Sequence, residues 1–328
     1  AESATRTFTD SAGREVEVPA QIDRIAPAGH TATQVLLTMA PDKLATLSQE
    51  LTADQAKYLG GDYADLPVTG AAFGAKGDLN KEAVAAAGAQ ILIDTGEAKD
   101  GIKEDLDTLQ TQLGIPVVFV ETTMDTYGDA YEMLGELLGM EDRGAELSAY
   151  CKNAYDETVS VMAGIPEDQR VRVAYLLGDA GTNTIAKNSY QGQVVDLVAN
   201  NVADLGKVSG SGSGTEVSLE QVSLWDPELI LFQEGSIYDT VGSDPAWADL
   251  SAVKSGNYYE VPGAPWCWLN NPPTVNQVLG MQWLPRLLYP DHYDDDMYDT
   301  VAGYFKTFYG YDLSQAEFDE IAAHAQAK

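Results

Sequence analysis

The segment EDRGAELSAYCKNAYDETVSVMAGIP, residues 141–166, is the longest helical pattern in this chain and the best guide to its architecture. Its apolar and small side chains recur every three to four residues, which is the spacing of one helix face. These residues are Leu147, Tyr150, Cys151, Ala154, Thr158, Val161 and Met162. Asp142 is placed to cap the start, and Gly164 and Pro166 end the helix. A helix of about 21 residues is about 30 Å long, so the segment predicts a rod that joins two lobes.

Strands and helices alternate on both sides of this helix. A hairpin is expected over 5–19, followed by strands at 24–27, 44–48, 66–69, 91–94 and 117–121, and by helices at 30–39, 53–59, 79–88, 102–113 and 126–138. The second half predicts a strand at 171–177 and helices at 191–198, from the prolines 272–273 to 288, at 297–308 and at 315–327. This alternation indicates an α/β protein of two Rossmann-like lobes with mostly parallel sheets. The expected limits are 1–140, the joining helix 141–166, and 167–328. Glycine-containing loops are expected at 70–77 and 209–214.

The two halves contain an internal echo. Residues 82–93 read EAVAAAGAQILI and residues 220–231 read EQVSLWDPELIL, an offset of 138. Either the lobes are related halves, or two helix-strand units match by chance. The echo places Glu82 and Glu220 in the first turn of a helix in each lobe. A carboxylate there either complements the helix dipole, by about 0.3–1 kcal/mol, or forms a matched acidic pair for a partner that carries basic residues.

The composition excludes several classes of protein. The chain has 328 residues and a net charge of −32, so binding of nucleic acid or anionic lipid is not expected. There is no apolar run of about 18 residues, the length that would indicate a membrane span. Cys151 and Cys267 either pair or remain buried thiols, and their separation along the chain favours thiols. The chain begins at Ala1 without Met, as an exported protein does after signal removal, or as a trimmed chain does.

The candidate ligand-binding residues of the first half come from the rule that ligands lie beyond the carboxyl ends of parallel strands, and the tryptophans of the second half from their place in a loop before a helix. In the first half the candidates are His30, Glu50, Phe73 and Thr95, and in the second half they are Tyr190, Glu234, Trp266, Trp268 and Asn270. The two tryptophans either stack on a flat ligand or pack inside the fold. His30 either meets the ligand, as a hydrogen-bond partner or an axial ligand to iron or cobalt, or bonds to the backbone. Tyr190 either lines the site or covers the core.

The chain resembles the class III solute-binding proteins of ABC importers, the group for iron-siderophores, haem and cobalamin. The resemblance covers nearly the whole chain. It rests on TFTDSAGREVEVP with RIAPAGH, LNKEAVAAAGAQILID, the helix at 141–166, NSYQGQVVDLVANNVAD, VSLEQVSLWDPELILF and PPTVNQVLGMQWLPRLLYP. It implies two lobes joined by one helix, export to the periplasm or as a surface lipoprotein, and delivery to a permease dimer. Glu82 and Glu220 match the glutamates that dock into arginine pockets of the permease.

The sequence departs from the pattern of this family in two places, and both limit the kinds of ligand that are expected. Gln277 follows Asn276 where many relatives have Arg, which weakens the case for an anion clamp there. The histidines are only His30, His292 and His324, so a bare first-row cation is not expected as cargo. The expected ligand is a metal chelate, such as an iron-siderophore, haem or a corrinoid, bound by a monomer without an intrinsic cofactor or metal. The alternative is an oxyanion such as molybdate or tungstate, held by helix N-termini.

A second alternative is an enzyme that acts on a metallated tetrapyrrole. The sequence contains no Gly-x-Ser-x-Gly elbow, phosphate-binding loop or dinucleotide fingerprint. Acidic residues are so abundant that no pair stands out as acid and base. The sequence therefore predicts a binding protein rather than an enzyme.

Overall fold

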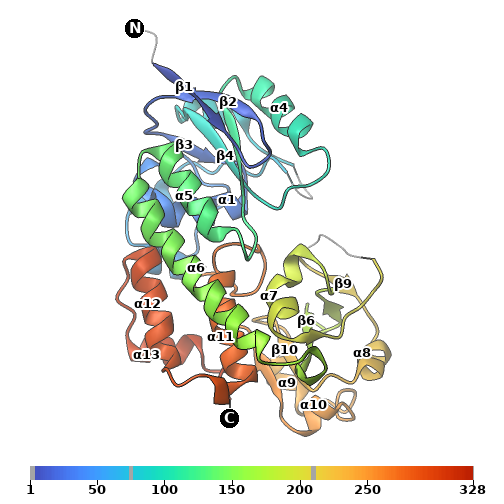
Figure 1. Cartoon of the computed structure of the whole chain (residues 1–328). Coiled ribbons are helices and arrows are strands. Elements are labelled where there is room, and N and C mark those ends of the chain that lie inside the picture. Colours follow the sequence, from blue (N-terminus) through green and yellow to red (C-terminus); the bar gives the residue numbers. More distant parts are fainter. Residues whose placement is uncertain (1–3, 74–76, 208–211, 328) are drawn as a thin grey trace. The chain divides into compact units, whose positions relative to one another are not determined.

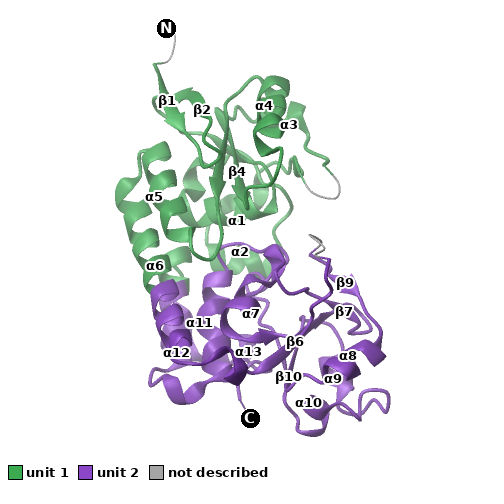
Figure 2. Ribbon diagram, turned by 45° about the vertical axis from the view of Figure 1, so that its right-hand side comes forward, with its two compact units in different colours: residues 1–153, 305–311 green, residues 154–304, 312–328 purple. Residues whose placement is uncertain are grey.

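The computed structural model describes residues 4–73, 77–207 and 212–327. Parts of the expected loops at 70–77 and 209–214 lie outside these ranges. The chain forms two compact units, unit 1 from Ala1–Asn153 with Phe305–Tyr311 and unit 2 from Ala154–Tyr304 with Asp312–Lys328 (Figure 2). These limits differ from the expected ones in two places. Helix α6, Glu141–Ala163, is divided between the units, and a short late segment belongs to unit 1.

Unit 1 is built on a parallel sheet of order β3-β4-β5, from Ile25–Pro27, Ile91–Gly96 and Val117–Glu121 (Figure 1). The expected hairpin is present as β1, Thr5–Thr9, and β2, Glu15–Pro19. The strands expected at 44–48 and 66–69 form only isolated bridges, Ile25 with Leu44 and Leu47 with Val68. The helices of this unit are α1 His30–Met39, α2 Ala53–Leu59, α3 Lys81–Ala86, α4 Ile102–Leu113 and α5 Tyr127–Leu138.

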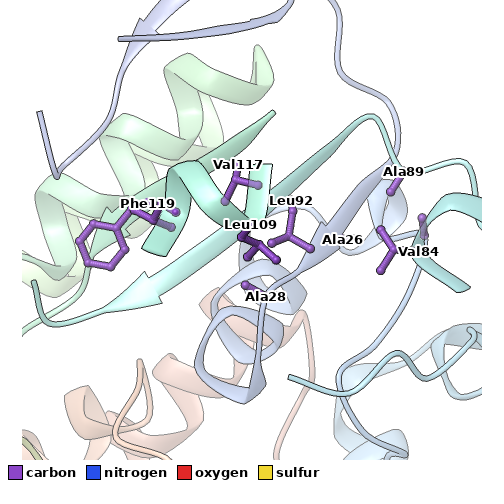
Figure 3. Packing of buried hydrophobic residues seen from close by; sticks show 10 residues of the cluster. Ala26, Ala28, Val84, Ala89, Leu92, Leu109, Val117 and Phe119 are labelled. Atoms are coloured by element: carbon purple, nitrogen blue, oxygen red, sulfur yellow. The ribbon is translucent and has the colours of Figure 1, made fainter. Parts of the chain in front are cut away.

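The core of unit 1 lies where α3 and α4 cover the sheet. Leu92 and Val117 come from neighbouring strands, Val84 from α3 and Leu109 from α4, and they form one buried cluster with Phe119 (Figure 3). The strands of a covered parallel sheet are apolar on both faces, and the run Ile91-Leu92-Ile93 has no exposed side chain. This packing fixes the ends of the strands, where the candidate residues lie.

Unit 2 has a mixed sheet. Its order is β11-β10-β6-β7-β9, with β8 also paired to β6, from Tyr258–Glu260, Leu229–Phe232, Arg172–Leu177, Asn183–Thr184, Thr215–Glu216 and Asn200–Asn201. Strands β6, β8, β10 and β11 are parallel, whereas β7 pairs antiparallel with β6 and β9. Its helices are α7 Gln193–Val198, α8 Leu219–Trp225, α9 Tyr238–Val241, α10 Ser251–Lys254, α11 Gln277–Leu288, α12 Met297–Tyr309, which ends in unit 1, and α13 Gln315–Ile321.

Several helix boundaries differ from the expected ones. Helix α3 is shorter at both ends than the expected 79–88, and α7 begins at Gln193 rather than at 191. Helix α11 begins at Gln277, after the prolines rather than at them. Proline is favoured at the first position of a helix, but the residues before the two prolines, Asn271 and Pro272, are biased out of the helical region, and the helix begins only at Gln277. Helix α13 ends at Ile321, short of the expected 327.

Helix α6 buries most of the predicted face, of which Tyr150 and Val161 are only half-buried. Leu147, Cys151, Ala154, Thr158 and Met162 are all nearly inaccessible, and the helix ends at Ala163 before Gly164. Asp142 does not cap it, because the helix already begins at Glu141.

Helix α6 also crosses α5 within unit 1. At the crossing, a Cβ on Gly144 would lie 2.6 Å from the Tyr131 carbonyl oxygen and 3.0 Å from the Gly135 Cα. Two glycines therefore allow the close approach of the two helices.

The two similar sequence segments, 82–93 and 220–231, form the same succession of elements, a helix followed by a strand. Helix α3 leads to β4, the middle strand of the unit 1 sheet, and α8 leads to β10, which lies between β6 and β11. Asn80 and Ser218 cap the two helices by accepting a hydrogen bond from the third amide. Val84 and Val222, at the 138-residue offset, are both fully buried anchors. Glu82 and Glu220 therefore occupy the same position in two like units.

Candidate ligand-binding residues

The N-terminus of α1 lies at the carboxyl end of the unit 1 sheet. The helix follows β3 directly, and its N-cap is Gly29, which offers no side chain to the first-turn amides. No acidic residue lies in the first turn. The leading amides of a helix have no partner within it and carry the positive end of its dipole. Such a terminus attracts a negatively charged group.

His30 is the first residue of this helix, and it is exposed. Its Nδ1 lies 2.8 Å from the Ser48 hydroxyl, which in turn lies 2.7 Å from the Thr33 hydroxyl. Thr33 also donates to the Gly29 carbonyl at 3.0 Å. The imidazole is thus oriented by Ser48, whose hydroxyl contacts Thr33 in the first turn of α1.

Thr95 lies next to the α1 terminus. The Thr31 hydroxyl donates to the Thr95 carbonyl over 2.8 Å, which ties the first turn of α1 to the end of β4. The Thr95 side chain is only 4% exposed, and its hydroxyl has no hydrogen-bond partner among the described residues. A buried polar group without a partner is costly, and a bound ligand could satisfy it.

Asp94 precedes Thr95 and is not among the ligand-binding residues that the sequence predicted. Burial raises the pKa of its carboxyl group to about 7, while the Thr95 amide and Lys99 act in the opposite direction. The available signal was an acidic residue that ends the apolar run Ile91-Leu92-Ile93. The abundance of acidic residues obscured it.

The other two candidates of unit 1 are exposed. Glu50 lies two residues after Ser48, close in sequence to the His30 contact. The amide of Ala72 donates to the Ala28 carbonyl at 2.7 Å, which holds the chain before Phe73 near the end of β3. Phe73 itself lines a cavity of about 180 Å³ with residues of α4, including Leu109 and Thr108. Neither His30 nor Thr95 lines that cavity.

Trp268 corrects an expectation. The side chain is 0% exposed, its Nε1 donates to the Ala264 carbonyl at 2.9 Å, and its ring meets Trp283 edge-on at 6.1 Å between centroids. These contacts are within unit 2, so the ring has no surface on which a ligand could stack. Trp266 is also buried, at 5% exposure. Of the two interpretations of this tryptophan pair, ligand stacking or packing inside the fold, Trp268 agrees with packing.

Asn270 is likewise used inside unit 2. Its Oδ1 accepts from the Tyr175 hydroxyl at 2.7 Å and from the Cys267 thiol at 3.4 Å, and its Nδ2 donates to the Gly212 carbonyl at 3.2 Å. The amide is fully buried, so it fixes the loop after β11 rather than facing a ligand.

The two cysteines are free thiols, as the sequence favoured. Burial raises the pKa of both Cys151 and Cys267, so neither is a ready thiolate.

Glu234 and Tyr190 are the remaining candidates of unit 2. Glu234 is exposed and follows the carboxyl end of β10, and its carboxylate lies against the Gly263 backbone, where a Cβ would collide with it. Tyr190 is half-buried and begins a short 3₁₀ turn that leads into α7. The unit 2 candidates thus sit in loops around the parallel strands, but only these two retain exposed surface.

The two echo glutamates are exposed second residues of their helices. Within the described ranges, neither Glu82 nor Glu220 has a hydrogen bond or an ion pair. In the same ranges, no group of three or more His, Cys, Asp or Glu side chains is placed to hold a metal ion. No described helix has both the length and the apolar character that crossing a bilayer requires.

Comparison with known proteins places these features in a family. The family model for periplasmic binding proteins matches residues 38–265. The molybdate-binding protein MolA of Haemophilus influenzae is 25% identical over 93% of this chain and 91% of its own length. The Fe(3+)-citrate-binding protein YfmC of Bacillus subtilis is 26% identical over 59% of this chain and 60% of its own length. An ABC transporter solute-binding protein from Sulfurospirillum deleyianum has a solved structure with a TM-score of 0.88 and 28% identity, covering 96% of this chain and 98% of that one.

These relatives bind solutes and are not enzymes, and the family acts outside the cytoplasm. Its members deliver small molecules to the permeases of ABC transporters. The chain therefore belongs to the periplasmic binding protein family, among the class III solute-binding proteins of ABC transporters.

Proposed function

We propose that this protein captures a metal-containing solute that presents negatively charged oxygen atoms, and delivers it to an ABC importer. The observation that carries the proposal is the uncapped N-terminus of α1 beside the unpartnered Thr95 hydroxyl. Helix amides and a hydroxyl are donors for oxygen anions. The protein itself does not satisfy these amides with a side chain, because the helix start has neither a capping side chain nor an acidic residue. The amides are therefore available to a bound solute.

Two solutes share this chemistry. A small metal chelate, such as a ferric carboxylate, is favoured by the similarity to a protein named for Fe(3+)-citrate. A compact oxyanion is favoured by the similarity to a protein named for molybdate, which extends over more of the chain. Haem and corrinoids are less well supported, because Trp268 offers no ring surface for stacking.

The proposal extends to the partner and the location. The exposed Glu82 and Glu220, without internal partners, would dock into basic sites on the two subunits of a permease. The protein would act as a monomer, either free in the periplasm or as a surface lipoprotein.

A substitution at the N-cap tests the anion site. Gly29→Asp adds a side chain that can cap the helix, and its Cβ would meet only Ala71 at 3.6 Å. The added charge would compete with an anionic solute at the same amides. We expect the dissociation constant for the bound solute to rise at least about tenfold, equivalent to about 1.4 kcal/mol, while the thermal midpoint is unchanged or higher.

Calorimetric titrations with ferric citrate, molybdate, haemin and cobalamin would identify the solute for the wild-type protein. Gly29→Asn is the matched control, because it caps without charge and should bind more tightly than Gly29→Asp. Equal affinities of the two variants, or binding of haemin or cobalamin alone, would refute the proposal.

A further inference from the structure

Helix α8 carries an apolar side chain next to the acidic residue at its start. Leu224 is 74% exposed, the most exposed large apolar side chain among the described residues. It lies four residues after Glu220, so both side chains are on the same face of the helix. Ser223 lies on this face too and is exposed. We call Glu220, Ser223 and Leu224 the α8 outer face.

The opposite side of α8 explains why Leu224 is not needed for folding. Val222 is fully buried in the unit 2 core, and Leu219 and Trp225 pack against the same cluster. The Trp225 carbonyl also accepts a hydrogen bond from Arg172. These residues anchor the helix, and the leucine at 224 faces away from them.

Unit 1 has the same face with a different composition. At the offset of 138 residues, Glu82 matches Glu220, while exposed Ala85 and Ala86 stand in the places of Ser223 and Leu224. The acidic residue is therefore kept in both units, but only unit 2 adds a large apolar side chain. Two identical basic sites would meet unequal surfaces.

We propose that Leu224 contacts the permease subunit that receives Glu220, so that the two units dock unequally. The inference rests on the proposed docking role of Glu82 and Glu220. The partner surface would present a basic residue for Glu220 and an apolar hollow one helical turn away. Burial of an exposed leucine favours association, and a residue beside a charge pair also excludes water from it. We assign the permease subunit as the partner of Leu224 because Leu224 and Glu220 lie on one continuous face of α8.

The experiment measures binding of the labelled, solute-free protein to membrane vesicles of the source organism that contain the importer. Leu224→Ser should weaken docking about tenfold. Ala86→Ser, which puts serine at the matching position of unit 1, should have little effect. Val159→Ser, at a 39% exposed position on α6, controls for loss of exposed apolar surface in general. Thermal midpoints should be alike, because none of these side chains is buried.

The outcomes separate this inference from the docking proposal. If Glu220→Gln weakens docking and Leu224→Ser does not, the role of Leu224 is refuted and docking through glutamates stands. If Glu82→Gln and Glu220→Gln together leave docking unchanged, the docking proposal itself fails. If Leu224→Ser instead removes a concentration-dependent dimer seen by light scattering, the face binds a second copy of this chain, which also overturns the inference.

Discussion

Asp94 is a partly buried titratable group at the end of β4 in unit 1. Its pKa in the folded protein is about 7, above the ordinary value of 3.8, because burial disfavours the charged form. Between these two pH values the folded chain holds a proton that the unfolded chain releases. Stability therefore falls as pH rises through this window, by about 1.4 kcal/mol for each unit of pKa difference.

Asp94→Asn should remove this dependence. We expect the variant to resemble the wild-type protein at pH 4 and to be more stable at pH 8, measured by urea unfolding. Asp105→Asn, at an exposed position on α4, serves as the control for loss of one negative charge. If the stability of the wild-type and Asp94→Asn proteins changes with pH in the same way, burial does not raise the pKa of the Asp94 carboxyl group.

Single residues were predictable where a rule of the fold determines them. The positions of His30 and Thr95 follow from the strand ends, and Thr31, the neighbour of His30, bonds to the Thr95 carbonyl. Their role in ligand binding stays a prediction. Trp268 and Asn270 lie at the same kind of place but point into unit 2. A sequence specifies that a loop follows a strand, but the direction of each loop side chain depends on packing against distant residues, here Trp283 and Tyr175.

At the scale of elements, the crossing of α5 and α6 depends on the absence of side chains. Gly144→Ala would normally stabilise a helix by about 1 kcal/mol. Here the added methyl group would lie 2.6 Å from the Tyr131 carbonyl, so the helices must separate. We expect a net loss of stability, measured as a lower thermal midpoint.

The matched control is Gly303→Ala in α12, where an added Cβ has nothing within 4 Å. That variant should gain stability. A gain at both positions would mean that the crossing can relax at little cost.

Most elements were predictable because helix starts, helix stops and buried strands have local signals. The long helix ended where glycine and proline follow it, and the echo correctly matched α3 to α8. The segments at 44–48 and 66–69 had strand-like composition, but they pair through single bridges. Whether an apolar segment becomes a ladder depends on its neighbours in the sheet, which local patterns do not specify.

At the scale of the whole molecule, the docking role proposed for the glutamates can be tested by removing both of them. Replacing both Glu82 and Glu220 by Ala should abolish solute uptake while the solute dissociation constant stays unchanged, because the side chains are exposed and have no partners within the described chain. Uptake in cells and calorimetric titration of the purified protein would measure the two effects. A weakened solute affinity would assign these glutamates to the binding site instead.

The path of the chain between its two units limits how the protein can be divided. The polypeptide passes from unit 1 to unit 2 after Asn153, returns at Phe305 and leaves again after Tyr311. Tyr58, Tyr131 and Tyr150 of unit 1 all pack against rings of that returning segment. A fragment that stops at Asn153 would lack those aromatic neighbours. The halves are thus interleaved, and neither gene truncation nor one proteolytic cleavage yields both of them intact.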